Sequence, residues 1–222
     1  MPASVTNERK SLEAVVVPLL EKIEFKKRTR DVFTLDLAPG VLGWLGLNRA
    51  TQHHTPGAVE INPVVGVRFE TVERLVAECR GEKFHAYLPP TVSSPIGYVM
   101  PQKQYMGWVF SPGRSDEAAT DMTDAIAADG VAFMHSIVDL AELRRRLQDR
   151  SGFEHQLAYR RPAAAMVAGD VESARALVDE AVAAPGGRSD HAAADFRRFA
   201  EAFRSRLPTV SRIDPFSHTP KT

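Results

Sequence analysis

Residues 58–79, AVEINPVVGVRFETVERLVAEC, constrain the fold more than any other stretch, because a strand pattern passes directly into a helix pattern. The first half is rich in β-branched and aromatic residues, which suit a buried pleated surface. Pro63 cannot donate to a strand ladder, so the centre of the predicted strand covers residues 64–69. After Phe69 the apolar period changes to about 3.6 residues, with apolar positions at Val72, Leu75, Val76 and Cys79. We expect this helix to lay its apolar face against the sheet to which the strand belongs.

The flanking segments extend the strand into an antiparallel sheet. Residues 9–23 have helical apolar spacing and predict a first helix that contains Pro18. Residues 25–37 and 41–51 predict two strands joined at the turn signal Pro39-Gly40, and residues 100–110 predict a fourth strand. Residues 88–95 hold three prolines and two serines and predict a loop. The expected fold is α+β, with about four strands and helices packed on one face.

From residue 115 onward the composition changes to Ala, Leu, Asp and Arg, and no further strand is predicted. Ser115, Asp139 and Asp170 are predicted helix N-caps, and Gly130 is predicted to end the first of these helices. The sequence from Pro208 onward lacks periodicity. We therefore predict a sheet part over residues 1–114, an all-helical part over residues 115–207 packed on it, and a loosely ordered tail over residues 208–222.

Composition excludes several classes of function. The 222 residues include 28 basic and 28 acidic side chains, so the formal net charge is zero and the electrostatic attraction that drives non-specific nucleic-acid binding is missing. The single cysteine, Cys79, excludes an internal disulfide, and with no signal segment in view it favours a cytoplasmic location. No apolar run approaches the roughly 20 residues of a membrane-spanning helix. We predict neither nucleic acid nor membrane as a partner.

Three histidines are the candidates for catalysis. His53 and His54 lie in a predicted turn, and His85 lies between the predicted helix and the 88–95 loop. Their spacing fits no zinc motif, and histidines in a polar turn are commonly just solvated. The sequence also lacks the motifs of serine hydrolases, zinc proteases and phosphate-binding loops. We predict no metal and no cofactor.

Two sets of residues are candidates for binding. The first is the basic run of Lys26, Lys27, Arg28 and Arg30. It could contact a phosphate or an acidic partner, although charges also protect strand ends against edge pairing. The second set contains the aromatic residues Trp44, Tyr105 and Trp108. Rigid amphipathic rings are typical of interfaces, although a buried position suits both tryptophans equally well.

Five fragments follow one another in an order that resembles a known family. They are IEFKKRTRDVFTLDL, GWLGLNRATQ, AVEINPVVGV, AFMHSIVDLAELRRRLQ and MVAGDVESARALVDEA. Together they resemble the DUF4304 family, small bacterial α+β proteins of unassigned function, over most of residues 8–184. Glu24 stands where that family more usually has a glycine, and residues 81–104 have no counterpart. The resemblance implies the fold and a bacterial immunity or accessory role, with no catalytic residues to carry over.

We therefore expect a non-enzymatic protein-binding or accessory protein of bacterial type, in an immunity or defence setting, with another protein as its partner. One alternative is a small hydrolase or transferase that uses the histidines near residues 88–95. Another is a structural subunit of a homo-oligomer.

Overall fold

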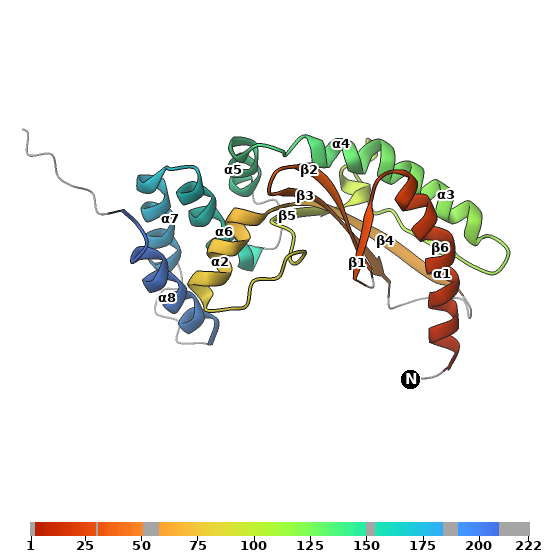
Figure 1. Ribbon diagram of the computed structural model, residues 1–222, viewed down its shortest axis with the longest axis horizontal. Helices are drawn as coiled ribbons and strands as arrows, with labels where there is room; N and C mark the ends of the chain where they lie inside the picture. The colour runs from red at the N-terminus through yellow and green to blue at the C-terminus, as the bar shows by residue number, and fades with distance from the viewer. Residues whose placement is uncertain (1–2, 30, 51–57, 150–153, 184–190, 209–222) are drawn as a thin grey trace, which may run out of the picture.

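A twisted antiparallel sheet lies at the centre of the molecule, with helices along one face and a group of helices at one end (Figure 1). The computed structural model describes residues 3–29, 31–50, 58–149, 154–183 and 191–208. The predicted α+β class is confirmed. No helix in this described part of the chain is long and apolar enough to cross a membrane.

The sheet has six strands within the described residues, where about four were predicted. Their order is β1-β2-β3-β4-β5, all neighbours are antiparallel, and β6 also pairs with β4. The strands are β1 (Lys26–Thr29), β2 (Val32–Ala38), β3 (Val41–Arg49), β4 (Val59–Phe69), β5 (Val92–Pro95) and β6 (Trp108–Phe110). Residues 25–37 thus hold two strands, and β5 lies in the segment predicted to be a loop. The strand predicted over residues 100–110 is confined to its last three residues.

The strand register shows which side chains share a face of the sheet. Leu45 is paired with Phe33 on β2 and with Val65 on β4, and all three side chains are buried. Helices α1 (Ala3–Lys22), α3 (Ser115–Ala125) and α4 (Val131–His135) lie along this side of the molecule (Figure 1). Because side chains alternate along a strand, Trp44 and Ser93, which both pair with Gly66, lie on the opposite face.

Helix α2 (Glu70–Arg80) follows β4 without a connecting loop. The Glu70 N–H donates to the carbonyl of Gly40 at 2.9 Å, which ties the start of the helix to the turn between β2 and β3. The buried side chains Val72, Val76 and Cys79 lie on a helix that packs mainly against α6 (Glu154–Val167) and α8 (His191–Arg204). The expectation that this face lies on the sheet is wrong, because the uninterrupted chain carries α2 past the end of the sheet.

The C-terminal helices complete the structure. They include α5 (Leu140–Gln148) and α7 (Val171–Ala183). Two of the three predicted caps are confirmed: Asp139 accepts from the Glu142 N–H at 2.8 Å, and Asp170 accepts from the Ser173 N–H at 3.0 Å. Two other predictions in this part are wrong. Ser115 makes no cap, because its hydroxyl donates to the Ser111 carbonyl at 3.1 Å. Gly130 does not end a helix, because a π-helical turn, η2 (Ile126–Gly130), joins α3 to α4.

One hydrophobic cluster runs through the described part of the chain. It extends from α1 and the sheet through α2 to the rings of Tyr159, Phe196, Phe199 and Phe203. The sheet and the helical group therefore share a continuous apolar interior.

Candidate functional site

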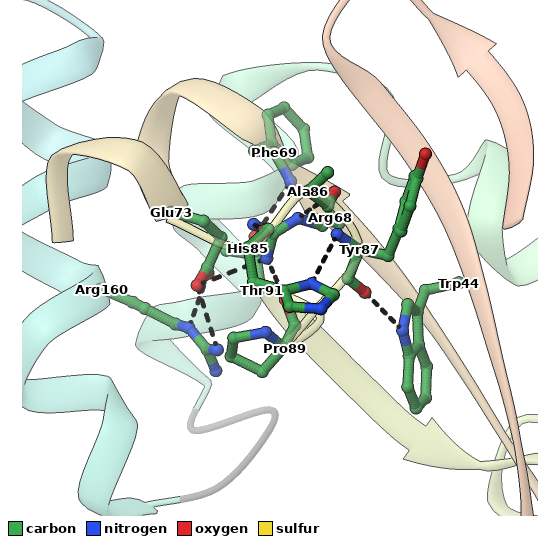
Figure 2. Close-up of polar contacts among 10 residues, drawn as sticks. All are labelled: Trp44, Arg68, Phe69, Glu73, His85, Ala86, Tyr87, Pro89, Thr91 and Arg160. Carbon is green, nitrogen blue, oxygen red and sulfur yellow. Dashed lines mark hydrogen bonds and ion pairs between the residues drawn. The ribbon is translucent and has the colours of Figure 1, made fainter. Parts of the chain in front are cut away.

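The most deeply buried charges among the described residues meet where β4 passes into α2. Arg68 is 1% exposed, Glu73 is 5% exposed and Arg160 is 3% exposed. Arg160 donates through Nε and Nη2 to the Glu73 carboxylate at 2.8 and 3.4 Å, and Arg68 Nη1 lies 3.8 Å from the same carboxylate. We call these three residues the ionic cluster. It joins β4, α2 and α6 at one point (Figure 2).

Arg68 also holds residues 81–91, the loop between α2 and β5. Its guanidinium donates to the backbone carbonyls of His85, Ala86 and Pro89, and the bond to Ala86 is 3.0 Å long (Figure 2). At the end of the loop, the Thr91 hydroxyl accepts from the Phe69 N–H at 2.9 Å. Arg68 therefore holds residues 85–89 of the loop from β4, and the bond between Phe69 and Thr91 holds its end.

Burial sets the electrostatics of the cluster. Loss of hydration lowers the pKa of both Arg68 and Arg160, and the negative charge of Glu73 opposes this in each case. A guanidinium stays charged in a protein even so, because its ordinary pKa is above about 12. The ionic cluster is therefore two cations that share one carboxylate.

A cavity of about 440 Å³, which we call the cluster pocket, opens between α2, the 81–91 loop and α6. Arg68, Glu73 and Arg160 line it, and Arg80, Glu82 and Lys83 add further charges. Its remaining walls are mainly apolar or aromatic, with Val76, Phe84, Leu88, Pro89 and Tyr159 among them. Its volume is within the range of small-molecule sites in proteins, and its lining is more highly charged than is usual for them.

The predicted basic run does not form one patch. Lys26 pairs with Asp36 at 2.6 Å, which lowers the pKa of that carboxyl, and Lys27 pairs with Glu13 at 2.5 Å. Arg28 donates to the Thr34 hydroxyl at 2.8 Å. Arg30 lies outside the described residues.

Arg28 and Trp44 instead meet at the 81–91 loop. The Arg28 guanidinium lies 4.7 Å from the centre of the Tyr87 ring, and Trp44 Nε1 donates to the Tyr87 carbonyl at 3.0 Å. Trp44 is buried, and its ring lies so close over Gly46 that a Cβ there would be 2.4 Å from it. These contacts give Trp44 a structural role in holding the loop.

The other two aromatic candidates differ in exposure. Trp108 is half-buried on β6 and packs against the core. Tyr105 is 55% exposed, and its hydroxyl donates to Glu60 at 2.8 Å, which raises the pKa of the phenol. Of the three predicted aromatic residues, Tyr105 is the one that a partner can reach most freely.

Of the histidine candidates, His53 and His54 lie outside the described residues. His85 is exposed at the cluster pocket, where its Nδ1 accepts from the Tyr87 N–H at 3.1 Å and its carbonyl accepts from Arg68. Among the residues that the structure describes, no group of three or more His, Cys, Asp or Glu side chains is placed to hold a metal ion.

The ionic cluster was missed at the sequence level, although it left a signal. Arg68 interrupts the otherwise apolar segment 64–69, and Glu73 adjoins the apolar stripe of α2. Arg160 stands three residues after the buried Leu157 and four before the buried Ala164, on the inner side of its helix. A charged residue at a core position predicts a buried partner, because an unpaired buried charge is unstable.

Comparisons with protein-family models, with curated proteins and with solved structures found no match for this chain. The resemblance to the DUF4304 family stays a prediction.

Proposed function

We propose that this chain is a non-enzymatic binding protein whose partner, another protein, docks beside β5. The observation that carries this proposal is a set of exposed apolar and aromatic side chains within residues 98–109. The backbone bond from Gln104 to Gly97, and the contacts of Glu60 with both Tyr105 and Val109, bring these segments near one another. Among the described residues, the large hydrophobic side chains that are most exposed are Tyr98 at 52%, Tyr105 at 55% and Val109 at 54%. We call these three residues the 98–109 patch. Exposed clusters of this kind are typical of interaction sites.

A groove of about 570 Å³ lies next to the patch and shares Tyr98 with it. The amides of Asn48 and Asn62 and the hydroxyl of Ser93 line one part of it, and Phe133 and Arg146 line another. Such a lining offers hydrogen bonds to a peptide backbone and ring surface to an apolar side chain. The charged residue in this lining, Arg146, is already paired with Glu142 at 2.7 Å, so the groove favours a neutral segment.

Strand β5 borders this groove through Ser93, Ser94 and Pro95, and it is the last strand in the main order of the sheet. An edge strand offers backbone N–H and C=O groups to an added strand, which is a common way to bind an extended peptide. The occupant that we propose is therefore an extended segment of another protein, with an apolar side chain directed to Tyr98. A protein that acts by occupying its partner suits the bacterial accessory or immunity role that the DUF4304 resemblance implies, and the single cysteine favours the cytoplasm as its location.

The test is site-specific photo-crosslinking in the native host, with the crosslinking amino acid at position 98 and, as a control, at position 180 on α7. We expect one partner to crosslink from position 98 alone. Purified partner should then bind the wild-type chain, and Tyr98→Ala should raise Kd by about tenfold or more. Mass spectrometry should find the partner chemically unchanged.

Val109 and Val167 give a matched pair of controls, because both are exposed valines and Val167, 36% exposed on α6, lies outside the patch. Val109→Ala should weaken binding and Val167→Ala should not. Equal crosslinking from positions 98 and 180, or an unchanged Kd in Tyr98→Ala, would contradict the proposal. A crosslink to a second copy of this chain would replace it with a homo-oligomer, and a modified partner would replace it with an enzyme.

A further inference from the structure

Within the described part of the chain, the ionic cluster holds one more positive charge than negative. Among the described residues, Glu73 is the one carboxylate paired with both Arg68 and Arg160. The neighbouring cations have acids of their own, since Arg74 pairs with Glu70 at 2.9 Å and Arg80 pairs with Glu82 at 2.7 Å. Lys83, at the cluster pocket, adds a further positive charge. A buried charge that lacks a counter-ion is costly, so this arrangement favours an anion in the pocket.

The two buried arginines differ in how many N–H groups are still able to bind a ligand. Arg68 directs its three nitrogens to the carbonyls of the 81–91 loop. Arg160 bonds Glu73 through Nε and Nη2, and a guanidinium carries five N–H groups. Arg160 therefore has donors beyond its two bonds to Glu73, and it lines the pocket. The buried Oε1 of Gln156, which also lines the pocket, accepts no hydrogen bond from any described residue.

The rest of the pocket defines the body of the ligand. Val76, Leu88 and Pro89 give apolar walls, and Phe84 and Tyr159 add aromatic rings. The Arg80 guanidinium lies 4.8 Å from the centre of the Tyr159 ring, so a cation borders the aromatic wall. Inorganic phosphate would leave these apolar surfaces unused, whereas an organic anion would cover them.

We propose that the cluster pocket binds a small organic monoanion, a carboxylate attached to an apolar or aromatic body, with the carboxylate on Arg160. One excess charge calls for a single negative charge, and the planar carboxylate matches the edge of a guanidinium. This site shares no lining residue with the groove beside β5, so it is a second binding function.

The test is thermal unfolding of the full chain with phenylacetate, and with the neutral isostere phenylacetamide, at constant ionic strength. Phenylacetate should raise Tm by about 3–6 °C at a tenfold excess over Kd, and phenylacetamide should leave Tm unchanged. Arg160→Met removes the excess charge and leaves Glu73 paired with Arg68 alone, so the Tm increase should disappear. Arg145→Met, at an exposed arginine of α5, should retain it.

If Arg160→Met does not fold, Arg160→Lys keeps the charge without the planar fork and should reduce the Tm increase severalfold. In the wild-type chain, phenylacetate should also shift the side-chain amide resonance of Gln156. No Tm increase at millimolar phenylacetate, an equal increase with phenylacetamide, or an increase that persists in Arg160→Met would overturn the proposal. Failure of the Tyr98 variants to weaken protein binding would leave these results unaffected.

Discussion

Glu142 accepts hydrogen bonds from two neighbouring guanidinium groups on the same helix, first from Arg145 and then from Arg146, and these lower its pKa from an ordinary 4.5 to about 2. Because this pKa is lower in the folded chain than in the unfolded chain, Glu142 stabilises the fold at pH values above about 4.5. This stabilisation is lost as the pH falls from about 4.5 to about 2. The Glu142 carboxylate is partly open to solvent and its partner Arg145 is exposed, so the free energy involved is small.

The pKa of Glu142 can be measured by an NMR titration of its side-chain carboxyl. We expect a midpoint near 2 in the wild-type chain and a higher midpoint in Arg145→Gln, which removes the stronger hydrogen bond. A wild-type midpoint near 4.5 would show that the two arginines do not hold Glu142 in solution.

Glu73 contributes more to the stability of the fold than Glu142 does, because two buried guanidinium groups share its carboxylate. Glu73→Gln leaves both charges without an acid and should lower the free energy of unfolding by about 3–5 kcal/mol. Glu78→Gln, on the exposed side of the same helix, should change it by less than about 0.5 kcal/mol. Urea denaturation measures both variants, and similar values for the two would mean that the ionic cluster contributes little.

At the scale of elements, β5 depends on a glycine in β4. A Cβ at Gly66 would lie 2.5 Å from the Val92 carbonyl, which belongs to backbone, whereas a Cβ at Gly43 would meet the flexible Met134 side chain at 2.8 Å. Gly66→Ala should therefore separate β5 from β4 and cost about 1–3 kcal/mol, and Gly43→Ala should cost less.

Hydrogen exchange distinguishes the two glycine variants. The amides of β5 should exchange faster in Gly66→Ala and at the wild-type rate in Gly43→Ala. Because β5 borders the proposed docking groove, Gly66→Ala should also weaken partner binding. Unchanged exchange in β5 would show that the close approach at Gly66 is relieved without loss of the strand.

The sequence predicted those elements whose cause is local. The period change after Phe69 placed α2, and Asp139 and Asp170 marked helix starts that their own side chains stabilise. Strand β5 was missed because VSSP has no apolar alternation, and its strand form comes from pairing with β4.

The candidate site was harder to predict than the fold. Arg160 and Glu73 are 87 residues apart in the chain, and no local pattern shows that they meet. The exposure of Tyr105 and the burial of Trp44 likewise depend on where residues 81–109 fold back on the sheet. Sequence patterns identified the aromatic candidates without separating the buried ring from the exposed one.

At the scale of the whole molecule, α2 connects the sheet to the helical group. Its buried side chains Val72, Val76 and Cys79 lie on the side that packs against α6 and α8, which both follow residue 114. A fragment of residues 1–114 should therefore expose this apolar face and leave Glu73 without Arg160. We expect the fragment to be insoluble or to lack dispersed amide resonances in NMR spectra. A soluble fragment with its own sharp thermal unfolding transition would instead show that the two parts are independent domains.

The central claim is that sheet and helices form one cooperative unit joined through α2. Both tryptophans, Trp44 and Trp108, lie in the sheet, whereas circular dichroism at the helical band reports mainly on the helices. Urea unfolding of the full chain should be followed by both signals in the same samples. The account predicts one transition with coincident midpoints. A tryptophan midpoint that separates from the helical midpoint would contradict it and would show that the sheet and the helical group unfold independently.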